Sequence, residues 1–456
     1  MSCFGPNWRF SSNTMNTSNA TTTVKQALLE KLHQEIVPEL EQLIEQLPDQ
    51  LLDFRQAEAS LRDGMLKVAQ HLLEGWANVA DLAVQRPCCP KCHVPMRNKG
   101  RVPGSVVTTL AAVAYRRPRW RCEDCHQECY PHDAVLCFLH HRVSWALAKV
   151  MSRLAAQMSF EDARDNLEED YRVHVAKETV RDVSEAAGQH VLQQEDELRQ
   201  RIQEQKAPLP ECAQTPAKAC VFADGTTVHT EGEWHEIRVA TVVTEDAGGT
   251  VLARQSRARF LPVDEVAWVL LLMARTVGYA NAPLRAFVAD GSHWLWRVAE
   301  QYFGSAVQIL DWYHLVEHVH KAANLVHGEG TDQGKQWSEQ LKDELWEGRG
   351  AVALSLVNAE RAKVRSPAKR EALQELATYL ENNLSRIDYP RYRKLGLPIG
   401  SGQVEAQCKT LVGARCKQAG MRNWTYAGVE GVLRMRAAKH DDSFDALWNR
   451  ELRLAA

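Results

Sequence analysis

Between residues 218 and 327 the sequence alternates strand-like and helix-like segments, and this order restricts the possible folds more than any other feature. Three segments rich in β-branched and aromatic residues predict antiparallel strands: KACVFADGTTVHT, EIRVATVV and VLARQSRARF. A helix is expected next, in the apolar segment PVDEVAWVLLLMARTVGY. A strand followed by a helix is then predicted twice, in LRAFVADGSHWLWRVAEQYF and in AVQILDWYHLVEHVHKAANLV.

Acidic residues mark the ends of these predicted strands. The first strand is expected to reach Asp224 with a glycine turn behind it, and the fourth ends at Asp290. Three strands, helix, strand, helix, strand is the order of a ribonuclease-H-like fold, in which the first and fourth strands lie side by side. The two carboxylates then meet at one edge, where oxygen ligands can hold a pair of divalent metal ions. Asp311 also ends a strand and is the alternative second acid.

A third acid follows a glycine-rich turn in the stretch GLPIGSGQVEAQCKTLVGARCK. Ser401 is a candidate N-cap, and Glu405 falls in the first turn of the helix that follows. A first-turn Glu can simply complement the helix dipole. Here Glu405 would be the third carboxylate of the metal site predicted at Asp224 and Asp290. The long separation of Glu405 from Asp290 requires an inserted helical subdomain.

Two cysteine pairs precede this region. The motifs CCPKC and RCEDC give the spacing of two zinc knuckles, with a predicted hairpin between them; the four candidate ligands are Cys89, Cys92, Cys122 and Cys125. Buried cysteines or redox chemistry are the alternative reading. Cys88 and Cys129 are spare thiols that could replace a ligand.

Composition describes an ordinary globular chain of 456 residues, with 45% hydrophobic residues and a net charge of −3. The charge is unevenly distributed, because residues 82–122 contain arginines and lysines but no acid, and residues 386–422 are also basic. Two basic surfaces on a nearly neutral chain favour a polyanionic partner. No apolar run is long enough to span a membrane, and no secretory signal is recognised, so we expect a cytoplasmic protein.

Two helices around the connector DYRVHV suggest a helix-turn-helix, whose second helix would present Lys177, Thr179 and Arg181 to DNA. The predicted fold is therefore a multi-domain α/β protein. Its order is a flexible tail (1–23), helices (24–80), a zinc ribbon (81–135), a helix-turn-helix-like region (142–205), a linker (206–217), the ribonuclease-H-like core (218–327), a helical insertion (328–395) and the core completion with C-terminal helices (396–456).

Four segments in this order and spacing resemble the DDE transposases of bacterial insertion sequences, in particular their ISKra-type group: VFADGTTVH, FVADGSHWLW, LDWYHLVEHV and GLPIGSGQVEAQCK. The resemblance covers about residues 218–448. It implies a catalytic triad of Asp224, Asp290 and Glu405 that holds two Mg²⁺ ions, with Mn²⁺ as a substitute. Asp311 and His314 match the C/D-x2-H signature of such enzymes and are expected to support the site.

This resemblance implies cleavage of DNA at the ends of a mobile element and transfer of the freed 3′-hydroxyl to target DNA. The implied partners are double-stranded DNA, as terminal inverted repeats and as target, and further copies of the chain in a dimer or larger assembly on DNA. The implied location is the bacterial cytoplasm, at the nucleoid, and Zn²⁺ has a structural role. The candidate DNA-binding residues are Arg116, Arg117, Arg119, Lys177, Arg181, Arg391, Arg393, Lys394, Lys409 and Arg415.

Two other functions are compatible with parts of the sequence. The segment HLVEH (His314, Glu317 and His318) matches the H-x-x-E-H signature of inverted zinc peptidases, although it leaves Asp224 and Asp290 without a role. A transposase-derived DNA-binding protein without catalysis would use only the ribbon and the helix-turn-helix. Mg²⁺-dependent nicking of terminal-repeat DNA separates these readings.

Overall fold

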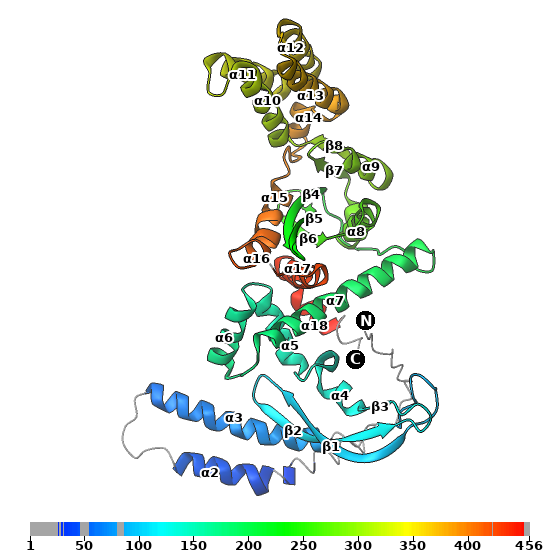
Figure 1. The fold of residues 1–456 in the computed structure, drawn as a ribbon, viewed down its shortest axis with the longest axis vertical. Helices are drawn as coiled ribbons and strands as arrows, with labels where there is room; N and C mark the ends of the chain where they lie inside the picture. Colours follow the sequence, from blue (N-terminus) through cyan, green and yellow to red (C-terminus); the bar gives the residue numbers. More distant parts are fainter. Residues whose placement is uncertain are drawn as a thin grey trace. The chain divides into compact units, whose positions relative to one another are not determined.

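The computed structural model describes residues 26, 29–30, 32–45, 54–79, 86–421 and 423–450, and the chain divides into two compact units. The first unit contains the residues up to Ala187 and those from Trp448 onward, and the second runs from Gly188 to Leu447. The chain is a mixed α/β protein, as predicted (Figure 1). The tail predicted at residues 1–23 lies outside the described residues. Within the described ranges, no helix is both long and apolar enough to cross a membrane.

The first unit begins with the predicted helices, the π-helical turn η1 (Leu32–Ile36), α2 (Val37–Glu45) and α3 (Phe54–Val79). A hairpin of β1 (Arg97–Val107) and β2 (Ala112–Arg121) follows, as predicted, and β3 (Glu128–Cys129) completes a three-stranded antiparallel sheet. The chain then forms α4 (Pro131–Leu136) and the 3₁₀ turn η3 (Phe138–His140).

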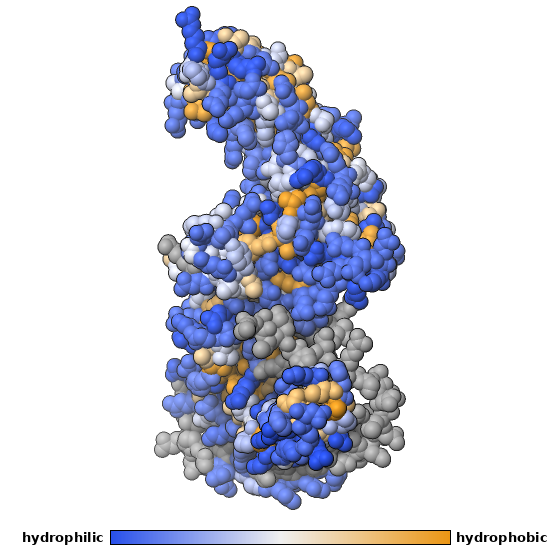
Figure 2. Space-filling model, turned by 45° about the vertical axis from the view of Figure 1, so that its right-hand side comes forward, coloured by the Kyte–Doolittle hydropathy of each residue, from blue (hydrophilic) through white to orange (hydrophobic). Residues whose placement is uncertain are grey.

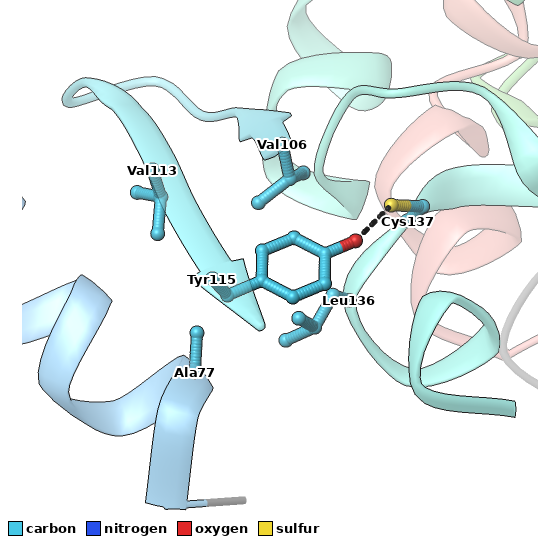
Figure 3. Close-up of a cluster of buried hydrophobic side chains, with 6 residues drawn as sticks. All are labelled: Ala77, Val106, Val113, Tyr115, Leu136 and Cys137. Carbon is cyan, nitrogen blue, oxygen red and sulfur yellow. Dashed lines mark hydrogen bonds between the residues drawn. The ribbon is translucent and has the colours of Figure 1, made fainter. Parts of the chain in front are cut away.

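A small core joins α3, the hairpin and α4. Its buried members are Ala77, Val106, Val113, Tyr115, Leu136 and Cys137. Figure 3 shows the Tyr115 ring in the middle of these side chains, with its hydroxyl directed toward Cys137. That hydroxyl also donates a 2.7 Å hydrogen bond to Asp133, so the polar end of the buried ring is satisfied.

Three helices follow, α5 (Trp145–Ala155), α6 (Phe160–Tyr171) and α7 (Lys177–Gln203). The α6 helix starts at Ser159, whose hydroxyl accepts the backbone N–H of Asp162 at 3.0 Å, and it stops where Arg172 adopts left-handed backbone angles. The break before α7 coincides with the predicted connector. From Gly188 onward, α7 belongs to the second unit.

The second unit contains a five-stranded mixed sheet. Its strands are β4 (Lys218–Thr230), β5 (Glu233–Glu245), β6 (Val251–Arg259), β7 (Leu284–Ala289) and β8 (Val307–Leu310). They lie in the order β6-β5-β4-β7-β8; the first three are antiparallel, and β7 and β8 run parallel to β4. The prediction that the first and fourth strands are neighbours is confirmed.

Helices cover both faces of this sheet (Figure 1). One face carries α8 (Val263–Thr276) and α9 (His293–Tyr302), with the 3₁₀ turn η4 (Tyr279–Asn281) between them in sequence. The other carries α15 (Gly402–Gln407) and the π-helical segment η6 (Cys408–Gly413), followed in the chain by α16 (Ala414–Cys416), α17 (Tyr426–His440) and α18 (Phe444–Arg450).

A helical insertion extends from the β8 side of the sheet. It contains α10 (Trp312–His327), α11 (Asp332–Trp346), α12 (Gly350–Lys363), α13 (Pro367–Asn383), η5 (Leu384–Arg386) and α14 (Tyr389–Lys394). Its visible surface, at the top of Figure 2, is mostly hydrophilic with small apolar spots. The helices α11 to α14 confirm that residues 328–395 are helical, as predicted.

Aromatic side chains close the base of the insertion, where the chain leaves the sheet and returns to it. Trp312 packs edge-on against Trp346 and Tyr389, with ring centroids 4.9 and 5.1 Å away. The Tyr389 hydroxyl donates to the carbonyl of Leu310 at 3.0 Å, and Arg393 lies over the Trp346 ring. We call Trp312, Trp346 and Tyr389 the aromatic neck.

A charged network fastens α7 and α17 to β6 within the second unit. One oxygen of Glu195 accepts hydrogen bonds from Arg257 at 2.9 Å and from Arg434 at 2.9 and 3.0 Å, and Arg257 also lies 3.5 Å from Asp441. Both guanidinium groups are nearly buried. Burial opposes ionisation of Glu195, but the charges of Arg257 and Arg434 outweigh it and lower its pKa to about 2.

Candidate active site and metal centre

The three aspartates predicted at strand ends lie level with one another on β4 and at the ends of β7 and β8. The last paired residues of β4 and β7 are Phe222 and Val288, and Asp224 and Asp290 each follow two positions later. Asp311 follows the last paired residue of β8, and its backbone N–H bonds to the carbonyl of Ala289 at 2.8 Å. The parallel arrangement therefore brings all three carboxylates to one edge of the sheet.

The turn predicted directly after Asp224 is wrong. The β4 strand continues to Thr230, because Gly225 and the β-branched residues after it remain paired with β5, in the register Gly225↔Arg238 to Thr230↔Glu233. β7 ends earlier, so Asp224 stands where β4 loses its neighbour on that side. Its carboxylate is half-buried at this step in the sheet.

Burial raises the pKa of Asp224, and the charge of Asp290 raises it further. The Asp224 carboxylate accepts the backbone N–H of Gly225 at 2.7 Å, and the thiol of Cys408 lies 3.8 Å from its other oxygen. Burial also raises the pKa of Cys408, to about 12, and Asp224 contributes, so this thiol is protonated and donates. A divalent cation bound beside Asp224 would offset the burial and the charge of Asp290 that oppose its ionisation.

Asp290 is held by the turn that follows it. Its two oxygens accept the backbone N–H of Ser292 at 2.8 Å and the Ser292 hydroxyl at 3.0 Å. The Tyr379 hydroxyl, from α13 of the insertion, donates to the Asp290 carbonyl at 2.6 Å. Tyr379 also stacks on His318 with ring centroids 4.0 Å apart. The insertion thus contributes directly to the surroundings of the second acid.

Glu405 lies near Asp311 and His314, and these three residues form a group that could bind a metal. The ligand atoms of these three residues all lie within 4.8 Å of one another, whereas Asp224 and Asp290 are not part of that group. Ser401 stands at the N-cap position of α15 as predicted, but its hydroxyl does not cap the helix. It donates instead to the Glu405 carboxylate at 3.0 Å.

Asp311 and His314 form an ion pair, with Nδ1 of His314 3.6 Å from Asp311. The interaction with Asp311 raises the pKa of His314 to about 9, against the effect of burial. Burial opposes ionisation of Asp311, but bonds from His314 and Ser401 outweigh it and lower its pKa. The pair is therefore charged at neutral pH, and His314 balances part of the negative charge of the site.

The four predicted zinc ligands Cys89, Cys92, Cys122 and Cys125 lie together. Their sulfurs are all within 4.8 Å of one another, and those of Cys89 and Cys125 are 3.4 Å apart. Tetrahedral coordination with Zn–S bonds of about 2.3 Å requires this kind of convergence. The backbone N–H of Gln127 lowers the pKa of Cys125 to about 7, which favours a thiolate. These cysteines can hold a zinc ion.

The two knuckles also have matching backbones. His93 and His126 each follow the second cysteine of a pair, and both adopt left-handed backbone angles, with φ of 57° and 60°. The chain therefore folds back around each pair of sulfurs in the same way. Cys129 is buried beside the four ligands, and Cys88 is exposed.

Seven of the ten predicted DNA-binding residues are exposed: Arg116, Lys177, Arg181, Arg391, Arg393, Lys394 and Lys409. The other three are partly or fully buried: Arg117 pairs with Asp133, Arg119 pairs with Glu128, and Arg415 lies over Trp424. Among the exposed residues, Arg181 pairs with Asp182 and Arg393 lies over Trp346. Arg415 is only 1% exposed, so this guanidinium supports packing in the interior. The sequence could not show this, since a buried Arg and a surface Arg look alike in a basic stretch.

The H-x-x-E-H reading receives no geometric support among the residues that the structure describes. His314 faces Asp311, whereas His318 stacks on Tyr379. The metal-competent group containing His314 includes neither Glu317 nor His318. Sequence reasoning missed Cys408 and Tyr379 as neighbours of the acids. Cys408 follows Glu405 by three residues, and that helical spacing was the available signal.

Comparison with known proteins leaves the geometry as the basis for assigning function, because no model of a known protein family matches the chain and no curated protein matches it.

Proposed function

We propose that this chain is a DNA transposase of the DDE type, with Asp224, Asp290 and Glu405 as its catalytic carboxylates. The observation that carries the proposal is the level placement of Asp224 and Asp290 on adjacent parallel strands, with the helix bearing Glu405 packed across the same sheet. The strand order β6-β5-β4-β7-β8, three antiparallel strands followed by two parallel ones, fits a ribonuclease-H-like core.

The donor set fits two Mg²⁺ ions, or Mn²⁺ in their place, since hard cations prefer carboxylate oxygens. Bound there, the ions would supply charge stabilisation for the attacking and leaving oxygens of a phosphodiester. Asp224, Asp290 and Glu405 would hold them. The raised pKa of Asp224 supports this assignment, because burial and the nearby charge of Asp290 oppose its ionisation when no metal is bound.

The reaction needs no protein nucleophile. In the first step a water oxygen bonds to phosphorus at the element end, the bond to the 3′ oxygen breaks, and the products are a 3′-hydroxyl and a 5′-phosphate. In the second step that 3′-hydroxyl attacks a target phosphodiester, and the target's own 3′ oxygen leaves with a proton. Asp290 is preferred over Asp311 as second acid because Asp311 is 0% exposed, whereas Asp290 is only half-buried.

The remaining modules would hold DNA. The zinc site would be structural and would fix the β1–β2 hairpin, and α6 with α7 would form the helix-turn-helix. The exposed cations are the candidates for phosphate contacts: Arg116, Lys177, Arg181, Arg391, Arg393, Lys394 and Lys409. We expect a dimer or larger assembly on terminal inverted repeats, acting at the bacterial nucleoid.

Strand cleavage tests the proposal directly. The protein is incubated with Mg²⁺ and a plasmid carrying the inverted repeats that flank its gene, alongside D224N, D290N and E405Q. Each variant should lose cleavage but retain repeat binding in a gel-shift assay. A matched control is D388N, at a carboxylate that caps α14. Repeat binding without any cleavage by the unaltered protein would favour a non-catalytic DNA-binding protein. Equal cleavage by the variants would exclude these acids.

A further inference from the structure

We infer that Asp311 is a positioning residue that sets the location of the Glu405 carboxylate through Ser401, and that it is not itself a metal ligand. The inference rests on the proposed function, since it concerns the site that Glu405 would complete. Three residues from distant parts of the chain carry it: Asp311 at the end of β8, Ser401 in the turn before α15, and Glu405 within α15.

Both oxygens of Asp311 are already used. Oδ1 caps α10 by accepting the backbone N–H groups of Tyr313 and His314 at 2.6 and 3.2 Å. Oδ2 accepts the backbone N–H of Ser401 at 2.6 Å. The side chain is 0% exposed. A carboxylate that accepts three backbone N–H groups has little capacity left for a cation, although it lies near Glu405.

The segment around Ser401 is fastened to the start of α10 along its backbone. The N–H of Trp312 donates to the carbonyl of Ile399 at 2.8 Å, next to the bond between Asp311 and Ser401. Between these two bonds, Gly400 lies so close to Tyr313 that an added Cβ would stand 2.7 Å from its ring. The turn is therefore held in one position relative to the strand end.

Ser401 in turn holds Glu405, the third proposed catalytic carboxylate, through two hydrogen bonds. Its hydroxyl donates to Oε1 of Glu405 at 3.0 Å, and its carbonyl accepts the backbone N–H of Glu405 at 3.1 Å. Ser401 is 3% exposed, so neither bond competes with bulk water. Oε1 of Glu405 is fixed, and Oε2 has no bond to Ser401. The series Asp311–Ser401–Glu405 thus preorganises one carboxylate for metal binding.

Two substitutions test separately the bond between Asp311 and Ser401 and the bond between Ser401 and Glu405. D311N retains an amide oxygen that can cap α10, since Asn is as good an N-cap as Asp, but its NH₂ group cannot accept the N–H of Ser401. S401A keeps the N–H bonded to Asp311 and removes the hydroxyl that holds Glu405. D388N is the matched control, because Asp388 is likewise a helix N-cap, accepting the N–H of Arg391 at 3.3 Å, and has no bond to Asp311, Ser401 or Glu405 among the described contacts.

Mn²⁺ binding to the zinc-loaded protein, measured by calorimetry without DNA, is the main readout. D311N and S401A should weaken Mn²⁺ affinity on the order of tenfold at unchanged stoichiometry, the usual effect of altering a residue that supports a metal ligand. D388N should bind like the unaltered protein. Loss of one bound ion in D311N would make Asp311 a ligand and overturn the inference. So would unaltered affinity in both variants, or absence of Mn²⁺ binding by the unaltered protein.

Amide hydrogen exchange of the metal-free protein tests the geometry. The Ser401 amide should exchange faster in D311N than in D388N, and equal protection would contradict the bond to Asp311. Cleavage assays separate this inference from the proposed function. D311N should require about tenfold more Mg²⁺ for half-maximal cleavage while keeping its rate at saturating Mg²⁺. An unaltered protein that binds Mn²⁺ yet never cleaves DNA would refute the transposase and leave the positioning role intact.

Discussion

Replacing Glu195 with Gln should destabilise the second unit by about 3 kcal/mol at pH 7. The substitution keeps the shape of the side chain but removes the charge that two nearly buried guanidinium groups share. Arg257 is 11% exposed and Arg434 is 4% exposed, and both bond to the same Glu195 oxygen. After substitution, Asp441 still lies 3.5 Å from Arg257.

Two estimates of the magnitude agree. The pKa of Glu195 falls from 4.5 to about 2, and at about 1.4 kcal/mol for each unit this corresponds to about 3 kcal/mol of stability. Because the side chain remains 31% exposed, screening by water makes this an upper value. Removing one partner of a buried ion pair costs about 3–5 kcal/mol in general. The lower end of that range is therefore expected.

The effect should depend on pH in one direction. A carboxylate with a lowered folded-state pKa contributes stability that is complete above the unfolded pKa and is lost as the pH falls toward the folded pKa. The difference between E195Q and the unaltered protein should be largest at pH 7 and should shrink between about pH 4.5 and pH 2.

Urea unfolding, followed by pulsed hydrogen exchange on peptides from β6 and α17, measures the free energy of unfolding of the region around Glu195. E204Q is the control, because the exposed pair of Glu204 with Lys206 should contribute less than about 0.5 kcal/mol. A difference for E195Q below about 1 kcal/mol at pH 7 would refute the reasoning. A difference that stays constant from pH 7 to pH 3 would refute it equally.

Three further predictions concern other parts of the chain. C122S should lower the zinc content from one ion per chain to none, as measured by mass spectrometry of the metal, and a retained ion would exclude this ligand set. G188A should cost about 1–3 kcal/mol in urea unfolding, because the added Cβ would stand 1.9 Å from the carbonyl oxygen of Gly431; wild-type stability would show that α7 and α17 can separate. D224N should raise the melting temperature of the metal-free protein, since it removes a buried charge beside Asp290, and a lower value would contradict the raised pKa.

Much of the sheet was predictable because its pattern is local. The β-branched residues of β4 and β5 and the turn residues between them determine strand pairing over short distances, and the order of strands and helices then restricts the topology. The same locality explains one error. Asp224 followed by glycine resembles a turn, yet β5 keeps the next residues of β4 paired, and that pairing depends on the partner strand.

The details of the site depended on contacts between distant residues. Ser401 was predicted as a helix cap, but the carboxylate that positions it is 90 residues earlier in the chain, and its hydroxyl turns to Glu405. Arg415 looked like a surface cation in a basic stretch and is buried against Trp424. No periodicity encodes either contact, because both depend on tertiary packing that the local sequence does not specify.

The aromatic neck has a consequence for the entropy of assembling the site. Without the neck, joining Ser401 to Asp311 would close a loop of 90 residues. The Tyr389 hydroxyl bonds to the carbonyl of Leu310 at 3.0 Å, so with the neck formed the loop that remains to be closed is (401 − 389) + (311 − 310) = 13 residues. Since closure entropy scales with the logarithm of loop length, the difference is about 2 kcal/mol. A folded insertion therefore lowers the entropic cost of bringing the third carboxylate to the sheet, and unfolding it would loosen the site without touching any of its ligands.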